Sequence, residues 1–267
     1  MNEKYKKLAE NIKDDPYGLV KHISFSKNGK YISSGGASDH FIKIWETETG
    51  LCLRTLKTSR RVLCIAISVY GKLASTYSDD SGFIQIWEVI NGDCYTLKGH
   101  SDLVFDLSFS PDGKYLASAC HDHTVKIWDV QNAKCIQTLK CHSHWVVSVC
   151  FSADGKYIAS GSDDKSVKIW KVDTGECVHT LKGHSSIVWS VSFSADSKYI
   201  ASGSDDKSVK IWKVDTGECV NTLCHSRLVT SVSFSADGPF LASVSSDKSI
   251  KIWEVNTGIC MDTIETK

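Results

Sequence analysis

Hydrophobic and polar positions recur along this chain in a fixed order of four short runs. Between Ile187 and Leu223 the apolar runs read IVWSVSFS, KYIASGS, SVKIWKV and CVNTL, and the turns between them read ADSK, DDK and DTGE. Val, Ile, Tyr, Phe and Trp favour strands, whereas Asp, Gly, Ser and Lys favour these turns. The pattern predicts a four-stranded antiparallel meander.

The first run of this unit alternates in side-chain size. Because successive side chains of a strand point to opposite faces, Ile187, Trp189, Val191 and Phe193 should share one face, and the smaller residues between them the other. A sheet with one bulky and one small face can stack on its neighbours. We therefore expect sheets packed face to face.

The same unit is repeated along the chain. A tag of the form FIKIW or SVKIW ends at six tryptophans, spaced by 41 or 42 residues: Trp45, Trp87, Trp128, Trp170, Trp212 and Trp253. A period of this length is typical of repeat architectures. The sequence predicts an all-β array of six four-stranded antiparallel units spanning residues 18–267.

Residues 1–17 precede the first unit and are too few to form another. Tyr5, Leu8, Ala9 and Ile12 fall at helical spacing. A short amphipathic helix and a frayed tail are both consistent with this N-terminal extension.

The repeat resembles the WD-repeat β-propeller family, with Gly183-His184 opening a unit and Ile211-Trp212 closing its third strand. The resemblance covers residues 18–267 and implies a β-propeller, for which the six units give six blades. It also implies a buried hydrogen-bonded set of His, Ser, Asp and Trp in each of four units: His100, Ser118, Asp122 and Trp128; His142, Ser160, Asp164 and Trp170; His184, Ser202, Asp206 and Trp212; His225, Ser243, Asp247 and Trp253.

The first two units depart from this family pattern. No histidine precedes Leu19 or Arg61, and the turns SGGASDHF and STYSDDSGF are longer than SGSDDKS. We expect these two units to be the least rigid. The usual glycine before the histidine is also replaced by Cys141 and Cys224.

The balance of charged residues limits which classes of partner the protein should bind. Lys plus Arg and Asp plus Glu each total 31, so no net positive field favours nucleic acid or anionic membranes. The longest apolar run is far shorter than a membrane span. We expect no direct nucleic-acid or membrane binding, and a location in the cytoplasm, with the nucleus also open to the protein.

Six of the 11 cysteines lie seven residues after a motif tryptophan, from Cys52 to Cys260. They occupy one position of the repeat, and equivalent positions in neighbouring units are too far apart for a disulfide. We interpret them as reduced, partly buried small side chains. Such usage fits a reducing, intracellular compartment.

No catalytic motif stands outside the repeat, so we predict a protein that is not an enzyme and needs no cofactor. The recurrence of His, Ser and Asp with a tryptophan is typical of a folding network. One alternative is a metal or enzymatic site in the turns Cys120-His121-Asp122-His123 and Cys141-His142-Ser143-His144. These turns lack the paired spacing of most zinc sites.

Function is sought where the copies differ. The resemblance places the first residues of the innermost strands, and the turn residues before the network aspartates, at one mouth of a central channel. Aromatic side chains flanked by charges suit a protein-binding hot spot, although the tryptophans could instead extend the core. The candidate partner-binding residues are Lys21, Arg61, Phe105, His121, Trp145, Asp163, Trp189 and Asp205.

These observations predict a non-catalytic scaffold that binds a protein or peptide on this top face, as a monomer within a larger complex. A further alternative is an incomplete propeller that needs another chain to close. Fold alone does not name the partner.

Overall fold

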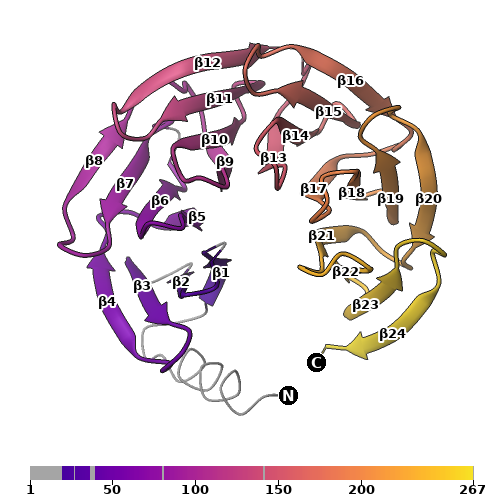
Figure 1. Ribbon diagram of the computed structural model, residues 1–267, viewed down its shortest axis with the longest axis horizontal. Coiled ribbons are helices and arrows are strands. Elements are labelled where there is room, and N and C mark those ends of the chain that lie inside the picture. Colours follow the sequence, from indigo (N-terminus) through magenta and orange to yellow (C-terminus); the bar gives the residue numbers. More distant parts are fainter. Residues whose placement is uncertain (1–19, 27, 37–39, 80, 141, 267) are drawn as a thin grey trace. The chain divides into compact units, whose positions relative to one another are not determined.

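The computed structural model describes residues 20–26, 28–36, 40–79, 81–140 and 142–266. These residues form strands joined by turns (Figure 1), which pair into six antiparallel sheets, as the sequence predicts. We call the sheets blades one to six in chain order. Within the described part of the chain, no helix has the length and hydropathy needed to cross a lipid bilayer. The N-terminal extension lies outside the described residues.

The first three blades contain strands β1 to β12. Their bounds are β1 Val20–Phe25, β2 Tyr31–Gly36, β3 Phe41–Glu46, β4 Cys52–Lys57; β5 Val62–Ile67, β6 Lys72–Tyr77, β7 Ile84–Glu88, β8 Cys94–Leu97; β9 Val104–Phe109, β10 Tyr115–Cys120, β11 Thr124–Asp129 and β12 Lys134–Lys140.

The last three blades contain strands β13 to β24. Their bounds are β13 Val146–Phe151, β14 Tyr157–Ser162, β15 Ser166–Lys171, β16 Cys177–Lys182; β17 Val188–Phe193, β18 Tyr199–Ser204, β19 Ser208–Lys213, β20 Cys219–Cys224; β21 Val229–Phe234, β22 Phe240–Ser245, β23 Ser249–Glu254 and β24 Cys260–Glu265.

The chain divides into two compact units. The first comprises residues 1–116 and 127–136, and the second comprises residues 117–126 and 137–267. Blades one and two therefore belong to the first unit and blades four to six to the second, while blade three contributes residues to both.

A β-bulge interrupts the first strand of blades one, two, four, five and six. In blade five, Val188 pairs with Ser204 but Ser190 pairs with Gly203, so the register shifts at Trp189. Val188 is consequently buried on the same side as Val191 and Phe193. The strict alternation expected for this strand is therefore wrong, because an extra residue in the strand reverses the faces that follow it.

Blades of the second unit stack through apolar faces. Val167, Ile169 and Leu181 of blade four form one buried cluster with Val188 and Ile200 of blade five. This packing agrees with the face-to-face stacking that the sequence predicts. The two blades pack so closely that position 161 has no room for a side chain, because a Cβ at Gly161 would lie 2.9 Å from Cγ1 of Val188.

Serine hydroxyls also join neighbouring blades beside the bulge. The backbone N–H of Val191 donates to Oγ of Ser148 at 3.1 Å, and the N–H of Val232 donates to Oγ of Ser190 at 3.1 Å. The small polar residues of the first strand thus satisfy amide groups of the next blade, which would otherwise be buried without partners.

The periodic cysteines open the fourth strand of their blades or lie next to its first residue. The ten described cysteines are all free thiols. Cys135 and Cys177 are half-buried, but Cys52, Cys94, Cys219 and Cys260 are exposed. The expectation of partial burial is wrong for these four, because the fourth strand is the outer edge of its sheet and leaves one side of this position uncovered.

Candidate protein-interaction surface

Blade four contains the hydrogen-bonded set that the resemblance implies. The indole Nε1 of Trp170 donates to Oγ of Ser160 at 2.9 Å, and the same oxygen lies 2.7 Å from Nε2 of His142. Nδ1 of His142 lies 2.7 Å from a carboxylate oxygen of Asp164. The chain of bonds therefore runs from a buried indole to a carboxylate.

Blades five and six repeat this geometry. In blade five, His184 lies 2.8 Å from Asp206 through Nδ1 and 2.8 Å from the Ser202 hydroxyl through Nε2, and the Trp212 indole donates to that hydroxyl at 2.8 Å. In blade six, the corresponding distances are 3.1 Å from His225 to Asp247, 2.7 Å from His225 to Ser243, and 2.7 Å from Trp253 to Ser243. The three networks lie wholly within the second unit.

The direction of each hydrogen bond follows from the groups involved. A carboxylate only accepts, so His142 Nδ1 carries the proton; neutral Nε2 then accepts from the Ser160 hydroxyl, whose oxygen accepts from the indole. Burial lowers the pKa of His142, although Asp164 opposes this shift. The histidine is thus neutral at pH 7.

The aspartate of each network stays ionised. Burial raises the pKa of Asp206, but hydrogen bonds from Ser208, the Ser185 amide and His184 outweigh it and lower the pKa to about 2. The same kinds of bonds lower the pKa of Asp164 and Asp247. Every polar atom of the set therefore has a partner suited to its charge, as a folding device requires.

In blade three the residues of the set are divided between the two units. In the first unit, the rings of His100 and Trp128 meet edge to face with centroids 5.9 Å apart. In the second unit, Asp122 accepts hydrogen bonds from the amide and hydroxyl of Thr124 at 3.0 and 2.6 Å.

Blade two has a different network that sequence reasoning missed. The indole of Trp87 donates to Oγ of Ser75 at 2.9 Å. This oxygen is hydrogen-bonded to the hydroxyl of Tyr77 at 2.9 Å, and the Tyr77 hydroxyl donates a hydrogen bond to Gln85. Burial raises the pKa of Tyr77 to about 12. A neutral Tyr–Gln pair thus takes the place of the His–Asp pair. The available signal was Tyr77 itself, in the segment STYSDDSGF that departs from the repeat.

The most distinctive surface of the second unit surrounds Trp145, just before β13. Its indole is stacked on the ring of His121 with centroids 4.3 Å apart and planes at 8°, and meets His144 edge to face at 5.1 Å. His123 stacks on His144 at 5.6 Å. We call His121, His123, His144, Trp145 and Asp163 the Trp145 surface.

Polar contacts fix this surface. Nδ1 of His144 lies 2.6 Å from a carboxylate oxygen of Asp163, whose own amide donates to the Trp145 carbonyl at 3.0 Å. Trp145 is nevertheless 42% exposed, and its indole N–H has no hydrogen-bond acceptor among the described residues. It presents a flat apolar area and an available donor, which are the properties of an interface anchor.

The structure brings together three of the eight predicted residues, His121, Trp145 and Asp163. Trp189 and Asp205 also belong to the second unit and are partly buried; Asp205 accepts from the Ser186 hydroxyl at 3.1 Å. Trp189 is absent from the described apolar cluster between blades four and five. His123 and His144, which sequence reasoning named only as part of a possible metal or enzymatic site, complete the group.

The remaining predicted residues lie in the first unit. Arg61 is exposed just before β5, and Phe105 is partly buried on β9. Lys21 lies on β1, and its side chain is outside the described residues.

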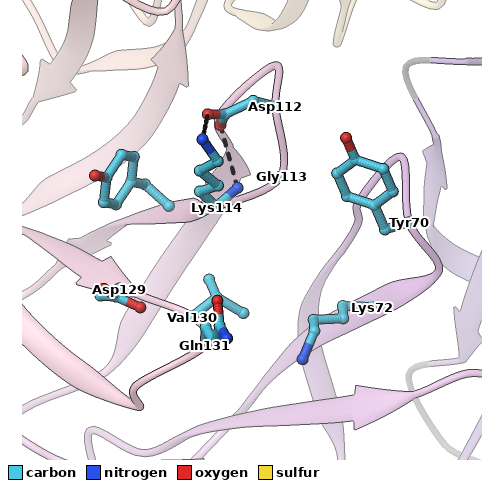
Figure 2. Close-up of a pocket in the computed structure, with 9 residues that line it drawn as sticks. Tyr70, Lys72, Asp112, Gly113, Lys114, Asp129, Val130 and Gln131 are labelled. Carbon is cyan, nitrogen blue, oxygen red and sulfur yellow. Dashed lines mark hydrogen bonds and ion pairs between the residues drawn. The ribbon is translucent and has the colours of Figure 1, made fainter.

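The first unit has a groove of its own, of about 420 Å³, lined by turns of blades two and three. Figure 2 shows Tyr70 and Lys72 on one side and the Asp112–Lys114 ion pair on the other. Lys72 is also paired, with Glu88 at 2.5 Å. The ammonium groups that line this groove are thus already neutralised by carboxylates.

Comparison with known proteins agrees with this architecture. Residues 146–266 match the family model described as the IFT122 first beta-propeller, and residues 11–46 and 92–129 match the model described as WD domain, G-beta repeat. The chain belongs to the WD-repeat β-propeller family. The prediction of a six-bladed WD-repeat propeller is confirmed, and WD-repeat propellers are generally non-catalytic scaffolds for protein interactions.

Individual relatives of this WD-repeat propeller match over a short segment. A stretch of 48 residues is 45% identical to the ribosome biogenesis protein BOP1 homolog of Drosophila virilis and 46% identical to that of Drosophila grimshawi. The stretch is 18% of this chain and spans 6% of each relative. A match of about one repeat length reflects the shared blade.

Proposed function

We propose that this WD-repeat propeller is a non-catalytic scaffold that binds a protein or peptide partner through the Trp145 surface. The observation that carries the proposal is the half-exposed indole of Trp145, held between two imidazoles with an available N–H donor. A side chain that is already ordered loses little entropy on binding, so its contact area contributes efficiently to affinity.

A comparison of equivalent positions in blades four, five and six supports blade four as the binding blade. The position of Trp145 is occupied by Ile187 in blade five and by Leu228 in blade six, and the position of His144 by Ser186. Only blade four of these three combines an indole with imidazoles there. The partner should therefore discriminate blade four from its near copy.

The Trp145→Ile variant tests this proposal, because it installs the residue that blade five carries. We expect partner affinity to fall by about 2 kcal/mol or more, as for a hot-spot residue, with an unchanged unfolding midpoint. Quantitative affinity capture with mass spectrometry, beside thermal denaturation, measures both. Phe240→Ala, which alters an exposed aromatic at the opposite strand end in blade six, is the control.

Equal capture of the same proteins by the wild type and Trp145→Ile would contradict the proposal. The same experiment, repeated with Trp189→Ala, tests whether the partner extends over blade five. We further propose that the protein acts as a monomer within a larger complex in the cytoplasm or nucleus; native mass spectrometry and imaging of the tagged chain test these points.

A metal site in the turns of blades three and four is the competing hypothesis. Both ring nitrogens of His142 are already hydrogen-bonded, and His144 Nδ1 is paired with Asp163. Elemental analysis of the purified protein separates the two hypotheses: stoichiometric zinc, lost together with partner binding on chelation, would favour the metal site.

A further inference from the structure

The second unit contains a groove that is lined by three lysines. It has a volume of about 350 Å³ and lies where the turn before β15 meets the segment after β16. Lys165, Lys168 and Lys182 line it together with the hydroxyl-bearing residue Thr180. Ammonium groups and hydroxyls are donors for an anion.

Lys168 is the most buried of the three lysines, and its bond to Thr180 recurs at the equivalent Lys126 and Lys210. Lys168 is only 8% exposed, and its Nζ donates to Oγ1 of Thr180 at 2.9 Å. Among the described residues, no carboxylate lies within ion-pair distance of Lys165, Lys168 or Lys182. Three ammonium groups that line one groove without carboxylate partners create a local positive potential, so the groove favours an anion.

The one carboxylate in the groove cannot meet that demand. Asp164 already accepts from His142, from the Ser143 amide at 3.1 Å, and from the amide and hydroxyl of Ser166 at 3.0 and 2.6 Å. Three ammonium groups and one carboxylate leave the groove with a net charge of +2. This charge matches one phosphate dianion.

Blade five lacks one of the three lysines at the positions equivalent to the blade-four groove. Cys224 stands where blade four has Lys182, so only Lys207 and Lys210 remain, and Lys210 is less buried than Lys168. The groove of the first unit differs as well, since its lysines are paired with carboxylates. Three lysines without carboxylate partners therefore distinguish the blade-four groove from both.

We infer that the groove of Lys165, Lys168 and Lys182 binds the phosphate of a phosphorylated serine or threonine in a protein partner. A single phosphate suits three donors that line one small groove, whereas a nucleic acid needs an extended positive field, and this chain has equal numbers of basic and acidic residues. The groove shares no residue with the Trp145 surface, although Ser143 and Asp164 of its lining directly neighbour His144 and Asp163 in the chain. The inference does not rest on the Trp145 surface.

Titration of the ¹⁵N-labelled full chain with a short phosphoserine peptide tests this inference by NMR. We expect saturable shifts of the Lys165 and Ser166 amides, competed by inorganic phosphate, and none with the unphosphorylated peptide. Lys165→Gln and Lys182→Gln should each weaken binding about tenfold, as expected for loss of a charge-assisted hydrogen bond. Both lysines are exposed, so the fold should be retained.

Lys207→Gln, the blade-five equivalent of Lys165→Gln, is the matched control and should bind like the wild type. Trp145→Ile should also bind the phosphopeptide normally, which keeps this result distinct from failure of the Trp145 surface. No saturable shift with either phosphate probe, or undiminished binding by the Lys165→Gln, Lys182→Gln double variant, would overturn the inference. Saturable shifts of the same amides with a single-stranded RNA but not the phosphopeptide would assign the groove to nucleic acid instead.

Discussion

Blades two and four bury the same indole–hydroxyl pair and satisfy it in different ways. In blade four the bonds continue through His142 to the ionised Asp164, whereas in blade two they continue through Tyr77 to the neutral Gln85. The first arrangement contains two groups that titrate between neutral and acid pH, and the second contains none. One blade architecture therefore accepts either a charged or an uncharged network, and only the charged one makes stability depend on acid.

The largest expected effect comes from cutting the charged network. Asp164→Ala removes the acceptor of His142 Nδ1 and of the Ser143 amide. Leaving buried donors without partners should lower the free energy of unfolding by roughly 1–3 kcal/mol. Chemical denaturation measures this change, and an unaltered midpoint would refute the role assigned to the network.

Acid should destabilise blades four to six more than blade two. Burial keeps the pKa of His142, His184 and His225 below its ordinary value, so as pH falls below about 6.5 the unfolded chain takes up protons that the folded chain does not. The lowered pKa of Asp206, about 2, adds a second loss of stability below about pH 4.

Each unit of pKa difference between the folded and the unfolded chain changes the free energy of unfolding by about 1.4 kcal/mol per group. Amide hydrogen exchange, corrected for intrinsic rates, should therefore show protection of β15 and β19 falling between neutral pH and about pH 5 while that of β7 changes less. An equal fall in the two regions would show that the His–Asp pairs are not the source.

The smallest expected effect comes from the neutral network. Tyr77→Phe removes the hydroxyl that joins Ser75 to Gln85, while the Trp87–Ser75 bond remains. We expect a loss of about 1 kcal/mol, the net value of a typical hydrogen bond. Denaturant titration measures it, with Tyr70→Phe at a 75% exposed position as the control. A loss as large as that of Asp164→Ala would remove the contrast between the two blades.

Much of this architecture could be predicted because it depends on local patterns. The tag spacing gave the number of sheets, and the family resemblance gave the networks of blades four to six. The expectation that blades one and two are the least rigid stays a prediction.

Features that depend on register or on distant contacts could not be predicted. A pattern of strictly alternating side chains cannot predict the bulge at Trp189. The Tyr77–Gln85 pair joins two strands and matches no motif of the family. For the candidate site, sequence reasoning identified Trp145, His121 and Asp163, but the stacking of His123 on His144 depends on how two turns approach each other. The partner-binding role of all eight predicted residues stays a prediction.

The near identity of blades four and five raises a question of assembly order. From Ser152 to Leu181 and from Ser194 to Leu223 the two copies differ only at Gly155 against Ser197 and His179 against Asn221. Strands this similar could exchange places during folding and form a mispaired sheet of nearly equal quality.

Both differences lie at junctions between blades. The Ser197 hydroxyl accepts from the Asp154 amide of blade four at 3.1 Å, His179 donates to the Asp215 carbonyl of blade five at 3.1 Å, and Asn221 donates to the Val255 carbonyl of blade six at 2.9 Å. A chain with exchanged copies would lose the bond between Ser197 and the Asp154 amide, because Gly155 has no hydroxyl, while keeping every bond inside each sheet. The Ser197 substitution therefore favours one linear order of otherwise interchangeable blades.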